Sequence, residues 1–124
     1  MIIDNKEYVY TIKGENYHCA MDVTMSFIGG KWKTVVMWYL RNKTMRFGEL
    51  KKQIPDITEK MLSLQLKALE EDGLIKRKVY PEVPLRVEYS MTEFGASLKP
   101  VLEAIAKWGR QHGESKGKLV PIKK

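Results

Sequence analysis

The fold of this chain can be inferred from residues 49–91, ELKKQIPDITEKMLSLQLKALEEDGLIKRKVYPEVPLRVEYSM. Near the middle, leucines recur at spacings of four and three residues, the pattern of an amphipathic helix: Leu62, Leu66 and Leu69. Thr58 is a good N-cap residue, and Gly73 stands where a helix commonly ends with a glycine. The pattern therefore predicts a helix from about Glu59 to Asp72.

A shorter helix and a hairpin flank this helix. Glu49–Gln53 predicts one or two helical turns, and Pro55-Asp56-Ile57 supplies the tight turn between the two helices. On the other side, alternating residues predict strands over Ile75–Val79 and Val87–Met91. The seven residues between them, 80–86, include two prolines and form a loop longer than most hairpin loops. We expect this loop to project from the domain.

Further helices are predicted on both sides of this region. Apolar residues at helical spacing predict a helix from Cys19 to Ile28, ended by Gly29-Gly30, and another over about Lys31–Arg41. Thr92 can cap a last helix, which we expect to be kinked at Pro100. Its apolar stripe consists of Leu98, Val101, Leu102, Ile105 and Trp108. This order of elements predicts a winged helix-turn-helix, a mainly α fold with a small β-hairpin.

The length of 124 residues favours one domain, which we expect over residues 18–109. Residues 1–17 are ambiguous, because their alternating pattern suits a short strand ending at Gly14 and an extended arm equally well. Residues 110–124 form a polar, basic tail that we expect to fray.

Composition argues against several classes of protein. With 44% hydrophobic and 30% charged residues, the chain has the composition of a soluble globular protein, and no apolar run is long enough to span a membrane. No secretory signal is visible, and a single cysteine cannot form an intramolecular disulfide, so we expect a cytoplasmic protein. His18 and His112 lie far apart and fit no metal-ligand spacing, and nothing places a nucleophile beside a base. We expect neither an enzyme nor a bound cofactor or metal.

The positive charge is concentrated where the helix-turn-helix is predicted. The chain has a net charge of +7, and residues 31–78 carry 12 bases and 6 acids. In a helix-turn-helix, the second helix enters the DNA major groove and the first lies across the backbone. If the leucines of helix 59–72 face the core, the opposite face has two lysines and no carboxylate. The predicted base-reading residues are Thr58, Lys60, Ser63, Leu64 and Lys67.

Basic residues around this helix are candidates for contacts to the DNA backbone or the minor groove. Lys76, Lys78 and Arg86 lie on or beside the predicted hairpin, which would form the wing, and Lys43 and Arg46 precede the first helix of the motif. The main alternative is a winged helix that binds another protein and has a merely solvated basic face. A third possibility, RNA binding, lacks the aromatic platform of single-strand readers.

Several short motifs together resemble one family. They are Gly29-Gly30-Lys31-Trp32, Arg46-Phe47 with Glu49-Leu50, Met61-Leu62, Leu69-Glu70-Glu71-Asp72-Gly73-Leu74, and Tyr80-Pro81-Glu82-Val83-Pro84 followed by Val87-Glu88-Tyr89. From Cys19 to about Gly109 the chain resembles the HxlR-type winged helix-turn-helix regulators, relatives of the MarR group. The resemblance implies a bacterial or archaeal homodimeric transcription regulator that binds double-stranded DNA at inverted-repeat operators.

Cys19 is the one residue with latent chemistry. It stands at the predicted start of a helix, where backbone N–H groups and the helix dipole favour negative charge. The resemblance implies a role, because some HxlR-type proteins sense electrophiles or oxidants through a cysteine at this helix start. A small-molecule or electrophile effector is therefore a candidate partner. The alternative is a buried cysteine that acts as a small apolar residue.

The terminal helices carry more apolar residues than a small core can cover. We expect a homodimer in which the first and last helices pair about a two-fold axis. The predicted interface residues are Phe27, Ile28, Val101, Leu102, Ile105 and Trp108. The alternative is that the last helix folds back on its own domain.

Overall fold

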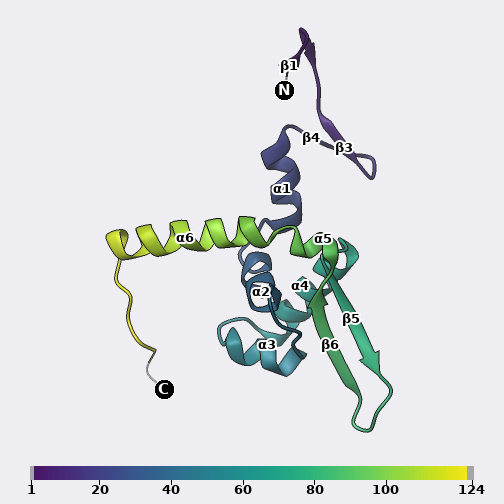
Figure 1. Ribbon diagram of the computed structural model, residues 1–124, viewed down its shortest axis with the longest axis vertical. Coiled ribbons are helices and arrows are strands. Elements are labelled where there is room, and N and C mark those ends of the chain that lie inside the picture. Colours follow the sequence, from purple (N-terminus) through teal and green to yellow (C-terminus); the bar gives the residue numbers. More distant parts are fainter. Residues whose placement is uncertain (1, 123–124) are drawn as a thin grey trace.

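A computed structural model describes residues 2–122 of the chain. Its central body contains the helices α2 (Lys33–Leu40), α3 (Phe47–Gln53) and α4 (Glu59–Glu71) and an antiparallel hairpin of β5 (Ile75–Tyr80) and β6 (Arg86–Met91). In Figure 1 the hairpin extends from the body as a wing. The predicted winged helix-turn-helix is confirmed.

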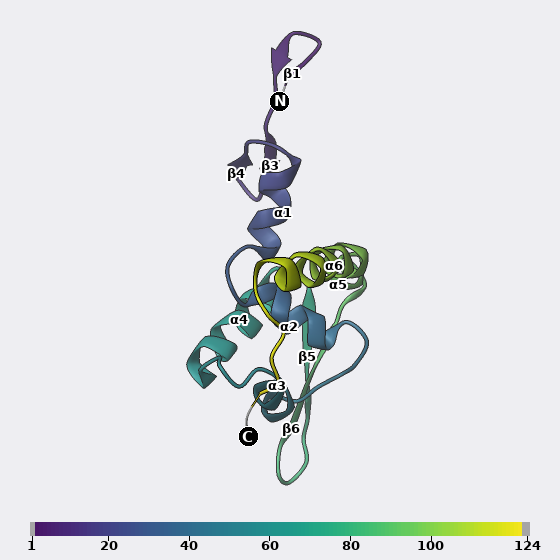
Figure 2. The ribbon, with the colours of Figure 1, turned by 90° about the vertical axis from the view of Figure 1, so that its left-hand side faces the viewer.

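The remaining elements surround this body. The helix α1 (Ala20–Ile28) precedes α2, the short helix α5 (Glu93–Ala96) follows the wing, and α6 (Lys99–Lys116) is the longest helix described. Figure 1 shows α6 reaching out from the body beside α2, and Figure 2 shows α1 leading away from it toward the N-terminal hairpins. No helix among the described residues is long and apolar enough to cross a membrane.

One hydrophobic core joins the helices of the body to the base of the wing. Leu62, Leu66 and Leu69 are buried, as predicted, and Ile75 at the start of β5 is buried beside them. The helix α2 contributes three further buried side chains: Val36, Met37 and Leu40. The helix α4 contacts both α2 and β5, and its buried leucines fix the direction of its exposed face.

Local signals define both ends of α4. The Thr58 hydroxyl oxygen accepts a hydrogen bond from the Met61 backbone N–H at 3.0 Å. At the other end, Gly73 has a φ of +75°, and the Leu74 N–H donates to the Leu69 carbonyl at 2.9 Å. Together with the Gly73 N–H donating to Glu70, these bonds form a Schellman motif. The predicted N-cap and glycine terminus are confirmed.

The wing is longer in its strands and shorter in its loop than expected. The strands pair from Ile75 with Met91 to Tyr80 with Arg86, so the connecting loop consists of residues 81–85 and not of the expected seven. The predicted projection from the body is confirmed (Figure 1). At its base, Met45 exchanges two backbone hydrogen bonds with Tyr89, which ties the segment before α3 to β6.

Three expectations for the C-terminal region are wrong. Thr92 caps the short helix α5 and not the last helix. Pro100 lies in the first turn of α6, where its missing N–H removes no helical hydrogen bond, and it starts the helix without kinking it. The helix continues to Lys116, so the residues directly after Gly109, expected to fray, are helical.

The N-terminal segment contains two small hairpins. The strand β1 (Ile2–Ile3) pairs with β2 (Lys6–Glu7), and β3 (Tyr10–Ile12) pairs with β4 (Glu15–Tyr17). Gly14, in the turn after β3, has a φ of +82°, which glycine adopts without strain. One strand does end just before Gly14, but the other three strands of this segment were not expected.

Candidate nucleic-acid interface

The outward face of α4 has the composition expected of a recognition helix. Lys60, Ser63, Leu64 and Lys67 are all exposed, on the side opposite the buried leucines. Leu64 is 51% exposed, so an apolar side chain stands among hydrogen-bonding groups on this face. Ammonium and hydroxyl groups can bind base edges or phosphates, and an apolar side chain can contact a thymine methyl group. The predicted orientation of the helix is confirmed.

Thr58 begins this face but also has a structural task. It is exposed, while its hydroxyl oxygen caps α4 through the Met61 N–H. The hydroxyl proton remains available to an acceptor outside the helix. A contact from Thr58 to DNA would therefore be compatible with its role as the N-cap.

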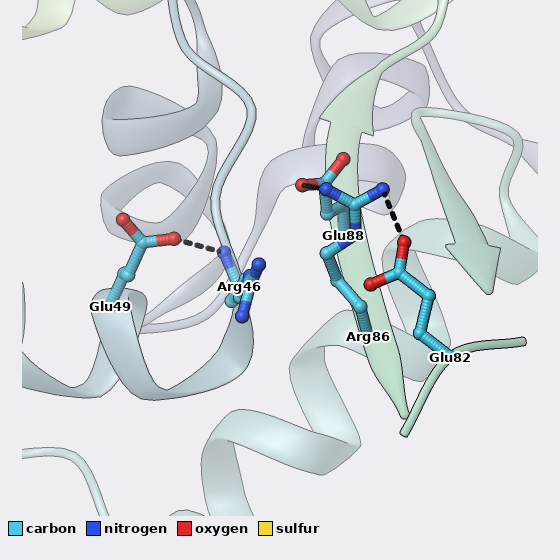
Figure 3. Close-up of polar contacts among 5 residues, drawn as sticks. All are labelled: Arg46, Glu49, Glu82, Arg86 and Glu88. Carbon is cyan, nitrogen blue, oxygen red and sulfur yellow. Dashed lines mark hydrogen bonds and ion pairs between the residues drawn. The ribbon is translucent and has the colours of Figure 1, made fainter. Parts of the chain in front are cut away.

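Arg46 lies at the N-terminus of α3, close to the base of the wing. Its backbone N–H donates to the Glu49 carboxylate at 2.9 Å, as Figure 3 shows, and this bond fixes the first turn of α3. The Arg46 side chain is exposed, and no carboxylate within residues 2–122 forms an ion pair with it. Lys43, in the loop just before, is also exposed. Both cations are therefore free to meet a phosphate.

The wing lysines and the wing arginine differ in their surroundings. Lys76 and Lys78 are exposed and lie on one face of β5, and the Lys78 Nζ is 4.8 Å from the centre of the Tyr80 ring. Arg86, predicted to contact DNA, is instead engaged within the wing: it pairs with Glu82 at 3.1 Å and faces Glu88 at 3.8 Å (Figure 3). Sequence reasoning missed these acids, although they lie four residues before and two residues after the arginine.

Cys19 occupies the N-cap position of α1, as expected. Its side chain is half-buried and does not cap the helix, while its backbone carbonyl accepts the Val23 N–H at 3.1 Å. The carboxylate of Asp22 accepts the His18 backbone N–H at 2.9 Å and so holds the segment that leads into the helix. The thiol is thus placed on a defined backbone with partial access to solvent.

The expected dimer surface is partly wrong. Ile28 and Leu102 are 4% and 2% exposed, because both side chains pack into the core of their own chain. Phe27 and Val101 are half-buried, and the Phe27 ring packs edge-on against Phe94 with 5.5 Å between ring centres. These side chains are already covered to a large extent within one subunit.

Other apolar side chains on the same helices remain open. Ile105 and Trp108 on α6 are 46% and 66% exposed, and Met21 and Met25 on α1 are exposed as well. The interface predicted from the sequence did not include these two methionines, although they lie at helical spacing on the predicted first helix. A groove of about 620 Å³ runs beside Ile105, between α2 and α6, and Val35, Trp38, Tyr39 and Leu119 also line it.

The described residues offer no constellation for metal chemistry. Among residues 2–122, no group of three histidine, cysteine, aspartate or glutamate side chains lies close enough to hold a metal ion. The chemical groups gathered on α4 and the wing are those that bind polyanions.

Comparison with known proteins agrees with this geometry. The family model described as HxlR-like helix-turn-helix matches residues 27–117. An uncharacterised HTH-type transcriptional regulator of Methanothermobacter thermautotrophicus is 46% identical over 110 residues, covering 86% of this chain and 84% of that protein. These proteins are transcription regulators and not enzymes.

Solved structures with the same fold are also similar in sequence. The redox regulator HypR in its oxidised form is 43% identical, with a TM-score of 0.73, and the match covers 75% of this chain and 96% of that one. The reduced form of the transcriptional regulator YodB from Bacillus subtilis is 35% identical, with a TM-score of 0.66, over 75% of this chain and 92% of that one. The family match, the sequence identity and the shared winged fold lead to one conclusion: this chain belongs to the HxlR-like helix-turn-helix family of transcriptional regulators.

Proposed function

We propose that this regulator acts as a homodimer that binds double-stranded DNA in a sequence-specific manner at inverted-repeat operators. The helix α4 reads bases in the major groove, and the wing contacts the backbone or the minor groove. In the bacterial and archaeal relatives DNA lies in the cytoplasm, which is where this protein would act.

The observation that carries the proposal is the outward face of α4. It presents Lys60, Ser63, Leu64 and Lys67 without a carboxylate among them. Of the acids of this helix, Glu59 lies in the first turn, and Glu70 and Glu71 lie at the far end. Phosphates that approach this face can therefore contact Lys60 and Lys67, and the helix dipole is favourable near the N-terminus. Thr58 adds a hydroxyl at the start of the same face.

Contacts outside α4 come from exposed cations that no carboxylate among the described residues neutralises. Arg46 and Lys43 are placed to contact the backbone on the α3 side, and Lys76 and Lys78 are placed to do so from the wing. Arg86 is not among these contacts, because its guanidinium already faces two carboxylates.

The dimer rests on the apolar side chains that the single chain leaves open. Ile105 and Trp108 of α6 and Met21 and Met25 of α1 are proposed as the centre of the interface, in place of the buried Ile28 and Leu102. Apolar groups of this extent seldom stay in water on a protein of this size. A two-fold arrangement would also place two recognition helices about 34 Å apart, one turn of DNA.

Selection of bound duplexes from a random pool tests the proposal. The expected product is an inverted repeat, and binding to random duplex should weaken with salt with a slope of about −0.9 per neutralised phosphate. Absence of binding to any duplex at low salt would contradict the proposal and favour a protein-interaction module.

A thiol response through Cys19 is the second part of the proposal. The thiol is half-buried at the start of α1, close in sequence to the proposed interface residue Met21, and the similar protein HypR is a redox regulator. An electrophile that adds to the sulfur would alter the pairing of the two subunits and hence the spacing of the recognition helices. The expected result is a change in operator affinity after alkylation that Cys19→Ser abolishes. An equal response of the parent and the variant would eliminate Cys19 as the sensor.

A further inference from the structure

One face of the β5–β6 hairpin contains a cluster of charged and aromatic side chains centred on Arg86. We call it the Arg86 cluster: Tyr80, Glu82, Arg86 and Glu88. The Arg86 Nη2 lies 3.1 Å from the Glu82 Oε1, and its Nη1 lies 3.8 Å from the Glu88 Oε2 (Figure 3). The guanidinium carbon is 3.8 Å from the centre of the Tyr80 ring, within the range of a cation–π contact.

The cluster connects three separate parts of the wing. Glu82 belongs to the loop 81–85, Glu88 to β6, and Tyr80 to β5, where it pairs directly with Arg86 across the hairpin. A single guanidinium thus joins the loop to both strands. The Arg86 side chain is 29% exposed and its Nε atom is buried, so the group lies against the hairpin and does not extend freely into solvent.

The charges of the cluster argue against a direct contact from Arg86 to DNA. Two carboxylates face one guanidinium, so these three groups together carry a net charge of −1. A phosphate that approached Arg86 would have to displace or face at least one glutamate. Lys76 lies opposite Ser90 across the hairpin and Lys78 lies opposite Glu88, but no carboxylate of the described residues is within ion-pair distance of either lysine.

We propose that Arg86 is a positioning residue that fixes the loop 81–85 on the hairpin, while the lysines of the wing make the phosphate contacts. The proposal rests on the DNA binding proposed above. It predicts that removing an acid of the cluster weakens DNA binding, because these acids hold Arg86 and the loop in place. Charge alone predicts the reverse, since an acid repels phosphates.

The decisive variant is Glu82→Gln, which removes a negative charge from the DNA-facing side. Charge alone predicts tighter binding, whereas loss of the Arg86–Glu82 pair predicts weaker binding, by about five-fold for a partly buried charge-assisted contact. Glu103→Gln, at an exposed position of α6, makes the same change in net charge away from the wing and is the control. The proposal is overturned if Glu82→Gln binds DNA as tightly as Glu103→Gln or more tightly.

Variants of the arginine distinguish positioning from phosphate contact. Arg86→Ala should weaken binding about as much as Glu82→Gln and keep the salt slope of the parent, and the double variant should be no weaker than either single one. A slope reduced by about 0.9 would show a direct phosphate contact and refute the proposal. Arg86→Lys keeps the charge but not the planar fork, so it should resemble Arg86→Ala; full rescue by lysine would also refute it.

A measurement on the free protein separates this inference from the proposed function. ¹⁵N relaxation should show greater picosecond-to-nanosecond motion at Val83 and Leu85 in Glu82→Gln and Arg86→Ala, with the melting temperature unchanged. If the parent bound no DNA, the proposed function would fail while this result still held. Unchanged motion of the loop in both variants would overturn the positioning role, whatever the DNA affinity.

Discussion

Replacing Gly95 with alanine should destabilise the fold more than the same replacement at any other glycine of the chain. Gly95 is buried in α5, and an ideal Cβ built there would overlap the Leu74 carbonyl oxygen and lie 2.9 Å from its carbonyl carbon. Contacts below 3.0 Å essentially do not occur for real Cβ atoms, and the group in the way is backbone. The clash therefore cannot be relieved by rotating a side chain.

The size of the stability loss depends on which groups must move to make room for the added Cβ. The Leu74 carbonyl also accepts the Thr92 N–H at 3.1 Å, and Leu74 and Ile75 are both buried where α4 passes into β5. A shift of α5 would weaken that bond and open the core at the base of the wing. Overpacking typically costs about 1–3 kcal/mol, and we expect the upper end of that range here. For a chain of this size, that corresponds to a fall in melting temperature of about 10–15 °C.

Gly48→Ala is the matched control. Gly48 lies in α3, an added Cβ there meets nothing within 4 Å, and its φ is not positive. Alanine should leave stability unchanged or raise it by up to about 1 kcal/mol. Thermal unfolding followed by circular dichroism, at one fixed protein concentration, measures both variants. If Gly95→Ala and Gly48→Ala melted at the same temperature, the close approach of α5 to the Leu74 backbone would be refuted.

Three further predictions concern α4, the interface and the wing. Thr58→Ala removes the N-cap of α4 and should lower the free energy of unfolding by about 1 kcal/mol in the absence of DNA, measured by urea titration; no loss would mean that the cap contributes nothing. Lys60→Ala should reduce discrimination between operator and random DNA by about 1–3 kcal/mol, whereas Lys76→Ala should weaken binding to both equally; identical binding profiles for the two variants would contradict the assignment of recognition helix and wing. Trp108→Glu should convert the dimer to a monomer in sedimentation at micromolar concentration, and a parent that already sediments as a monomer would exclude the dimer.

The helix α4 could be predicted from the sequence in detail because its signals are local. The spacing of Leu62, Leu66 and Leu69 sets the buried face, and a helix with 3.6 residues per turn then exposes the residues between them. Thr58 and Gly73 act on backbone groups a few residues away, so the ends of α4 do not depend on distant parts of the chain. The polar composition of the outward face therefore follows from the residues of the helix alone.

The wing could be predicted only in outline. Alternation placed both strands, and turn residues placed the loop, because these too are properties of neighbouring residues. Whether the Arg86 guanidinium is free or paired depends on two features of the folded wing. One is the register that pairs Arg86 with Tyr80, and the other is the loop conformation that brings Glu82 close to it. Counting positive charges along the chain treats every arginine as free, and it overlooks acids that the hairpin brings alongside.

The order of the elements from α1 to β6 follows from the sequence alone, as do the limits and outward face of α4. Which apolar residues of the terminal helices remain exposed depends instead on tertiary packing. Ile28 and Leu102 carry the same helical signal as Met25 and Ile105, yet the first pair packs against the body and the second pair faces outward. Periodicity identifies an apolar face but not its partner, because burial depends on how helices far apart in sequence cross one another.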